Sequence, residues 1–68
     1  MTNADRMKNL AERVLTFRAV NGISQDEFAR RAGVSKRTIC YLEKTPESMH
    51  LREITIRKIE YALMGGRR

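Results

Sequence analysis

The chain has 68 residues, enough for one small hydrophobic core, and we expect a single domain over residues 1–66 with a basic tail at residues 67–68. Fourteen Lys and Arg against eight Asp and Glu give a formal net charge of +6, which favours a polyanionic partner such as nucleic acid. No apolar run approaches the roughly 18 residues of a membrane span, and the polar start lacks the apolar region of a signal peptide. The single cysteine excludes an intramolecular disulfide, so we expect a protein of the reducing cytoplasm.

The N-terminal segment has the pattern of a long amphipathic helix. Thr2 and Asp5 stand at the spacing of a capping box, and Gly22 provides a stop that can take the left-handed conformation. Between them, apolar residues recur on one helical face: Met7, Leu10, Val14 and Phe17. The pattern predicts a helix over residues 3–21.

Two shorter helices are predicted next. Ser24 with Glu27 repeats the capping box, and the second helix carries Phe28, Ala29 and Ala32 inward until Gly33 ends it. Ser35 caps a third helix, which stops near Lys44 because proline disfavours a helical conformation at the residue before it, here Thr45.

A polar loop is expected up to residue 50 or 51, followed by a last helix. Gly65 and Gly66 close this helix, whose inward face consists of four residues: Ile56, Ile59, Ala62 and Leu63. Composition and pattern together predict an all-α fold, a small bundle of four helices, or of five.

The segment over residues 25–44 has the spacing of a helix-turn-helix. The second helix needs a small inward residue at its middle, Ala29, so that the third can approach closely, and the turn asks for positive φ at Gly33. Val34, Ile39 and Leu42 then fill the angle between the two helices. The alternative is an ordinary helical hairpin with the same spacing.

The third helix begins with exposed hydrogen-bond donors, as the major groove of DNA requires. Arg37 can bind O6 and N7 of guanine through two hydrogen bonds, and Tyr41, one turn later, can meet a thymine methyl group or donate to a phosphate. The alternative is that Lys36 and Arg37 are solvated surface charges and Tyr41 a surface aromatic. Arg30 and Arg31 are expected to be ordinary solvated residues of the second helix.

Over about residues 10–64, these motifs resemble the Cro and repressor family of helix-turn-helix proteins, also called the xenobiotic-response-element type. The resemblance is carried by six motifs: Gly22-Ile23-Ser24-Gln25, Ala29, Gly33-Val34-Ser35, Ile39, Leu42-Glu43 and Ile59-Glu60-Tyr61-Ala62-Leu63. It implies a cytoplasmic protein of a prokaryotic or phage-type nucleoid that binds double-stranded DNA at a pseudo-palindromic operator as a homodimer. It further implies that this protein represses transcription by excluding polymerase.

The resemblance also implies roles for individual residues. The base-reading positions of the family fall on Lys36, Arg37 and Tyr41. Its supporting positions fall on Ser35, Thr38 and Cys40. Its phosphate contacts after the third helix fall on four residues: Lys44, Thr45, Ser48 and Arg52. Gln25 is expected to contact a phosphate and to brace the third helix.

A structural ion pair between Arg18 and Glu43 follows from the same resemblance. The periodicity agrees, because Arg18 lies four residues after Val14 on the buried stripe, where an unpaired charge would be costly. The sequence departs from the family early in the last helix, where an inward leucine is usual and Glu53 stands here between Leu51 and Ile54. We therefore expect that helix to start late or to be rotated.

A second apolar stripe on the last helix points to dimerisation. Ile54, Tyr61 and Met64 lie apart from the face that the core needs, and a small domain seldom exposes so much apolar surface without using it. Many relatives dimerise through a fifth helix, whereas this sequence ends with Gly-Gly-Arg-Arg after the fourth. The alternative is that Tyr61 lies along the surface and Ile54 covers the loop.

The sequence gives little indication of metal binding, catalysis or small-molecule binding. Cys40 has no Cys or His at zinc-ligand spacing and no local base, so it is expected to be a half-buried filler, and His50 is likewise alone. No catalytic constellation or phosphate-binding loop is present, so we expect no enzyme, no cofactor or metal, and no small-molecule ligand. Other possible functions are a DNA-binding antitoxin, a restriction-modification controller protein, or a protein-interaction module with the same fold.

Overall fold

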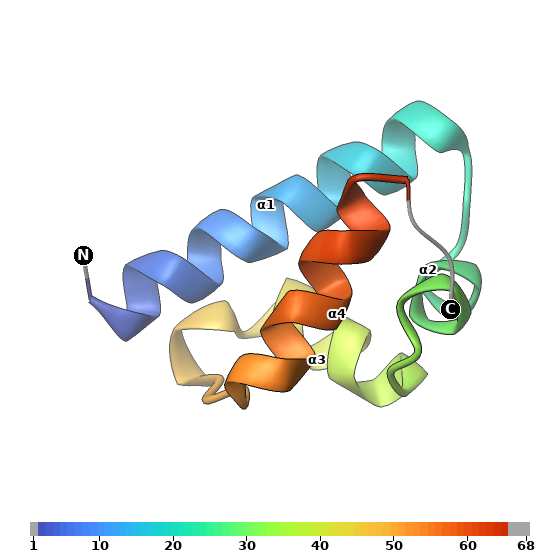
Figure 1. Ribbon diagram of the computed structural model, residues 1–68. Helices are drawn as coiled ribbons and strands as arrows, with labels where there is room; N and C mark the ends of the chain where they lie inside the picture. The colour runs from blue at the N-terminus through green and yellow to red at the C-terminus, as the bar shows by residue number, and fades with distance from the viewer. Residues whose placement is uncertain (1, 66–68) are drawn as a thin grey trace.

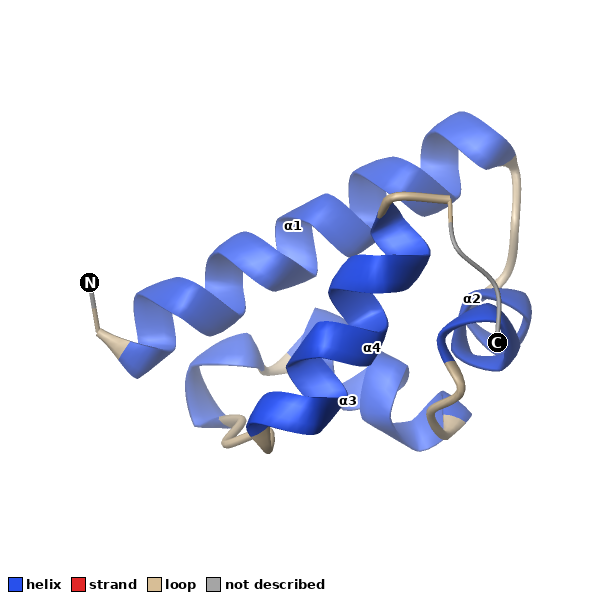
Figure 2. Ribbon diagram, viewed as in Figure 1, coloured by secondary structure: helices blue, strands red, loops and turns tan. Residues whose placement is uncertain are grey.

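The computed structural model describes residues 2–65, and these form a helical bundle (Figures 1 and 2). The elements, in chain order, are α1 (Asn3–Asn21), α2 (Gln25–Ala32), α3 (Lys36–Lys44), the 3-10 turn η1 (Pro46–Ser48) and α4 (Glu53–Leu63). No strand occurs within the described range, so the predicted all-α fold of four helices is confirmed. Gly66 and the basic tail at residues 67–68 lie outside the described residues. No helix in this range combines the length and apolar character needed to cross a membrane.

Side-chain oxygens start the first three helices as predicted. In each, a hydroxyl accepts a hydrogen bond of 3.0 to 3.1 Å from the backbone N–H three residues later, and the capping residues are Thr2, Ser24 and Ser35. Such a bond satisfies one of the amides that a helix leaves unpaired at its N-terminus. Left-handed glycines then end α1 and α2, with φ of 62° at Gly22 and 75° at Gly33.

The core lies where α1, α2, α3 and α4 meet, with α4 crossing α1 in Figure 1. Twelve hydrophobic residues are buried: Met7, Leu10, Ala11, Val14, Phe28, Ala29, Ala32, Ile39, Leu42, Ile56, Ile59 and Ala62. Phe28 meets the half-buried Phe17 edge to face, with ring centroids 5.7 Å apart. Val34 packs against this core from the turn between α2 and α3, as its spacing predicts.

The connection between α3 and α4 is more ordered than the expected polar loop. Pro46 opens η1, because its fixed φ is already suited to the first position of a helical turn. The side-chain amide of Asn3 donates to the carbonyl of Met49 at 3.0 Å and lies 3.3 Å from Nδ1 of His50. The start of α1 therefore holds the end of this connection in place.

The start of α4 explains the departure at Glu53. The helix begins at this residue without a side-chain cap, Leu51 packs against the core before it, and Ile54 is exposed after it. Glu53 instead points to α1 and accepts two hydrogen bonds from the guanidinium of Arg6, at 3.0 and 2.6 Å. The hydrogen bond and the charge of Arg6 lower the pKa of Glu53, and the same contact raises the pKa of Arg6.

Candidate functional site

The exposed face of α3 is the strongest candidate site. Ile39 and Leu42 are completely buried, and this fixes which side of the helix faces solvent. Five side chains line a hollow of about 340 Å³ on the outer side: Lys36, Arg37, Cys40, Tyr41 and Lys44. Cys40 is half-buried in this face, as expected, and the other four residues are exposed. Lys36, Arg37 and Tyr41, the three residues expected to read bases, are therefore brought together on one surface.

This face is positively charged, and its cations stand apart from those of the neighbouring helix. Within the described range, Lys36, Arg37 and Lys44 take part in no ion pair. The neighbouring helix differs, because Arg30 and Arg31 of α2 each pair with acidic residues of the same helix. Three uncompensated positive charges on one helical face make a strong local attraction for a polyanion.

Arg37 and Tyr41 are in contact on this face. The guanidinium carbon of Arg37 lies over the ring of Tyr41, 5.9 Å from its centroid. The two residues stand four apart on α3, one turn of the helix, which places their side chains on the same side. The contact leaves the Arg37 side chain on the surface, next to the hollow.

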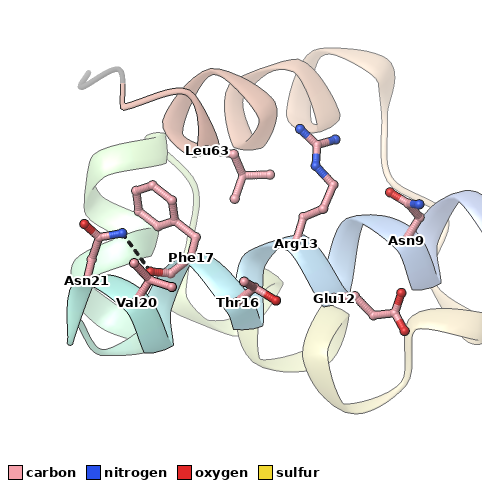
Figure 3. Close-up of a pocket in the computed structure, with 8 residues that line it drawn as sticks. All are labelled: Asn9, Glu12, Arg13, Thr16, Phe17, Val20, Asn21 and Leu63. Atoms are coloured by element: carbon pink, nitrogen blue, oxygen red, sulfur yellow. Dashed lines mark hydrogen bonds between the residues drawn. The ribbon is translucent and has the colours of Figure 1, made fainter.

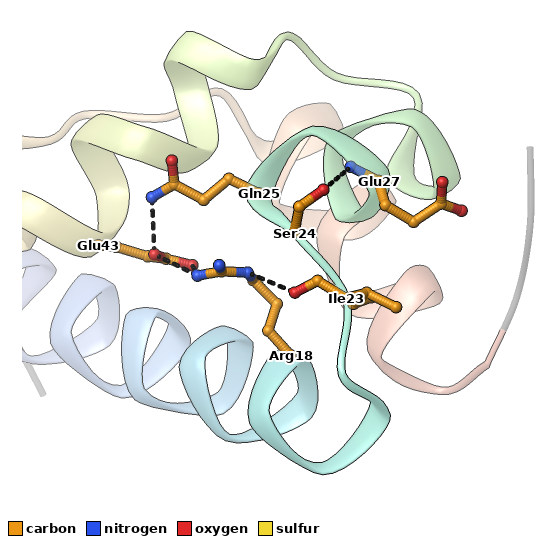
Figure 4. Close-up of polar contacts among 6 residues, drawn as sticks. All are labelled: Arg18, Ile23, Ser24, Gln25, Glu27 and Glu43. Carbon is orange, nitrogen blue, oxygen red and sulfur yellow. Dashed lines mark hydrogen bonds and ion pairs between the residues drawn. The ribbon is translucent and has the colours of Figure 1, made fainter.

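A partly buried ion pair lies behind α3, and its hydrogen bonds join three helices (Figure 4). Nη1 of Arg18, on α1, donates to both carboxylate oxygens of Glu43 at 2.8 and 2.9 Å, and its Nε donates to the carbonyl of Ile23 at 3.2 Å. Nε2 of Gln25, the first residue of α2, donates to the same carboxylate at 2.8 Å. Only 8% of the Glu43 side chain and 22% of the Arg18 side chain are exposed.

This network has two consequences for α3. Glu43 is the only acidic residue of the helix, and because its carboxylate is taken up by Arg18 and Gln25, it does not offset the charges of the outer face. The same bonds tie the C-terminal end of α3 to α1 and to the start of α2. The bracing expected of Gln25 is thus seen as a direct hydrogen bond.

Hydroxyl side chains form hydrogen bonds at both ends of α3. The hydroxyls of Ser35 and Thr38 are 2.9 Å apart, and Ser35 also caps the helix, so both are engaged in holding its first turn. At the other end, the hydroxyl of Thr45 donates to the carbonyl of Tyr41 at 3.2 Å. Ser48 in η1 and Arg52 before α4 are exposed, and neither makes a side-chain hydrogen bond or an ion pair in the described structure. Arg52 is not in contact with the hollow on α3.

A second hollow lies away from α3, between α1 and the end of α4 (Figure 3). Its volume is about 460 Å³, and eight residues line it: Asn9, Glu12, Arg13, Thr16, Phe17, Val20, Asn21 and Leu63. Val20 is 79% exposed, and the sequence pattern assigns it no role. An apolar residue outside the core-facing stripe of a helix can nevertheless indicate an exposed apolar surface. The sequence-predicted dimer residues Ile54, Tyr61 and Met64 are exposed on α4 but do not line this hollow.

No group of three or more His, Cys, Asp or Glu side chains that could hold a metal ion occurs within residues 2–65. Comparison of the chain with protein-family models, with curated proteins and with solved structures gives no match.

Proposed function

We propose that this protein binds double-stranded DNA through α3, which lies in the major groove while α2 and the turn at Gly33 hold it at the surface, as a helix-turn-helix. The observation that carries the proposal is the outer face of α3, where Lys36, Arg37 and Lys44 form no ion pair with any acidic residue in the described part of the chain. The major groove is about 12 Å wide and admits an α-helix. A face with paired charges, like that of α2, would attract the duplex far less.

The role of each residue in DNA binding depends on its position on or near α3. Arg37, with its planar fork of donors, and Lys36 and Tyr41 beside it reach base edges. Lys44, Thr45 and Ser48 follow one another at the C-terminal end of α3, where they contact phosphates, as do Gln25 and Arg52. Ser35, Thr38 and Cys40 support the reading face from its first turn and its middle.

The biological role that fits this site best is a cytoplasmic transcriptional repressor of the Cro type. Ile54, Tyr61 and Met64 are 58%, 48% and 80% exposed on α4, and their apolar stripe serves as a two-fold seam between two copies. A dimer would place two α3 helices about 34 Å apart, in successive major grooves of a pseudo-palindromic operator. Sedimentation should then show a dimer at micromolar concentration, and a monomer would argue against this seam.

The experiment that tests DNA binding starts with selection of bound duplexes from random sequences by the wild-type protein. Lys36→Ala combined with Arg37→Ala should abolish binding to the selected duplex, while circular dichroism shows the helical fold retained. Lys8→Ala combined with Arg13→Ala removes the same charge from the exposed surface of α1 and serves as the matched control. This control should keep the sequence preference.

Two outcomes would contradict the proposal. If the wild-type protein selects no duplex, or if the variant without Lys36 and Arg37 binds as well as the wild type, the outer face of α3 does not bind DNA. Intact binding of a protein partner by that same variant would favour the protein-interaction function of this fold.

A further inference from the structure

We propose that Tyr41 is a positioning residue for Arg37, and that the two side chains read one guanine as a unit. This inference rests on the proposed DNA binding and deepens it. It assigns the sequence preference at one base pair to a tyrosine that acts through the arginine, in addition to any contact that Tyr41 makes with DNA itself.

The geometry of the free protein carries the first step. The guanidinium carbon of Arg37 lies 5.9 Å from the centroid of the Tyr41 ring, inside the limit of about 6 Å for a cation–π contact. Within the described part of the chain, no carboxylate pairs with Arg37 and draws its side chain elsewhere. The ring is thus the group that holds the guanidinium before DNA arrives.

The second step follows from the shape of the guanidinium. A ring that holds this planar group by a cation–π contact leaves the N–H donors along the edges of the guanidinium free. Two parallel hydrogen bonds to O6 and N7 of guanine need those edges and a fixed orientation of the plane. An exposed arginine that is already held loses less rotamer freedom on binding, and a cation–π contact at an exposed site corresponds to roughly a two- to five-fold gain.

The other cations of the face are not organised in this way. Lys36 and Lys44 carry compact point charges with freely rotating donors, and no ring contact is present at either residue. The hollow between these side chains is therefore best suited to one arginine-read guanine, with Lys44 attracting a phosphate beside it.

The test measures base preference in the selected duplex, one base pair at a time. Arg37→Lys keeps the charge but removes the fork, so the base pair at which it loses the preference for guanine is the one read by Arg37. Tyr41→Ala should lower the preference at this same base pair about two- to five-fold, whereas Tyr41→Phe keeps the ring and should retain it. Leu15→Ala removes an apolar side chain of α1 that is 45% exposed, as Tyr41 is, and should leave that base preference as it is.

A second measurement uses the free protein. The side-chain protons of Arg37 should be shifted by the ring current in the wild type and in Tyr41→Phe, and this shift should disappear in Tyr41→Ala. The inference is overturned if Tyr41→Ala weakens all duplexes equally, or if it changes the preference only at another base pair, because Tyr41 would then act by its own contact alone. Failure of the wild-type protein to bind any duplex would overturn the proposed function together with this inference.

Discussion

Glu43 affects the charge of the outer face of α3 although its side chain does not lie on that face. It lies on α3 next to Leu42, and its carboxylate turns inward, where Arg18 and Gln25 donate to it. An exposed carboxylate at this point of the helix would offset part of the positive charge of the outer face. Its burial is tolerated because both oxygens are satisfied.

Arg18→Ala should destabilise the fold by about 2 kcal/mol, because it leaves the Glu43 carboxylate nearly buried without its cation. The loss stays below the full cost of breaking a buried pair, since Gln25 still donates to Glu43. Thermal unfolding followed by circular dichroism should show a fall in Tm of roughly 10 °C.

Arg13→Ala is the matched control, because Arg13 and Glu60 are 3.8 Å apart with both side chains more than 40% exposed. Such a surface pair contributes at most about 1 kcal/mol. Equal Tm values for Arg18→Ala and the wild type would mean that the inner pair does not hold α3.

At the scale of elements, contacts far apart in the chain position the helix ends. Asn3 and Arg6, both in the first turns of α1, hold Met49 and Glu53, which are 46 and 47 residues away. These bonds fix the connection that carries Ser48 and Arg52 and set where α4 begins. Contacts with α1 thus position both the C-terminal end of α3, through Arg18, and the start of α4, through Arg6.

The Arg6–Glu53 contact should make stability depend on pH. Glu53 has a lowered pKa in the folded state, so the contact stabilises the fold above the ordinary pKa of a glutamate, and this contribution is lost as the pH falls through the folded value. Glu53→Gln should therefore be less stable than the wild type near pH 7, and the difference should vanish once the pH lies below the folded-state pKa of Glu53. The effect should be smaller than that of Arg18→Ala, because both side chains are well exposed.

Chemical denaturation at a series of pH values measures this difference. Glu12→Gln, which removes an exposed carboxylate that forms no ion pair in the described structure, should show little change in stability at any pH. A constant difference between Glu53→Gln and the wild type across the series would contradict the assigned role.

Local features of this fold could be predicted from the sequence, while contacts between distant residues could not. Thr2, Ser24 and Ser35 bond to amides three residues away, and Gly22 and Gly33 adopt positive φ within their own turns, so these elements follow from short patterns. The bonds from Asn3 and Arg6 span most of the chain, and no periodicity links their ends. The Arg18–Glu43 pair follows from the family resemblance together with the position of Arg18 on the apolar stripe of α1.

The candidate site shows the same division. Which residues of α3 face outward follows from the buried positions of Ile39 and Leu42. The pairing of the α2 cations follows from local spacing, because each lies four residues after its acidic partner. The lack of ion-pair partners for the α3 cations in the described structure depends instead on where the carboxylates of other elements lie in space. The contact of Arg37 with Tyr41 depends on rotamers, which a sequence pattern does not specify.

At the scale of the whole molecule, a net charge of +6 on so small a domain would attract any polyanion. The location of each cation therefore decides whether it contacts DNA directly or only adds to the general attraction. Lys44→Ala should weaken DNA binding similarly for all sequences and should reduce the slope of log K against log salt by about 0.9, because one phosphate contact is lost. Titrations of the selected duplex at several salt concentrations measure this slope.

Lys8→Ala removes an unpaired, exposed cation of α1 and is the control for Lys44→Ala. Its slope should match that of the wild type, since a residue away from the duplex releases no counterion. Equal slopes for all three proteins would place Lys44 outside the interface.

The bonds among Arg18, Gln25 and Glu43 hold α3, for which we propose DNA reading, in place before any duplex is present. The backbone of α3 is then already ordered when the protein meets DNA, and only the long basic side chains of its outer face remain to be immobilised on binding. Association with a DNA sequence and dissociation from a non-matching one should then both be fast, because neither step requires α3 to fold or unfold.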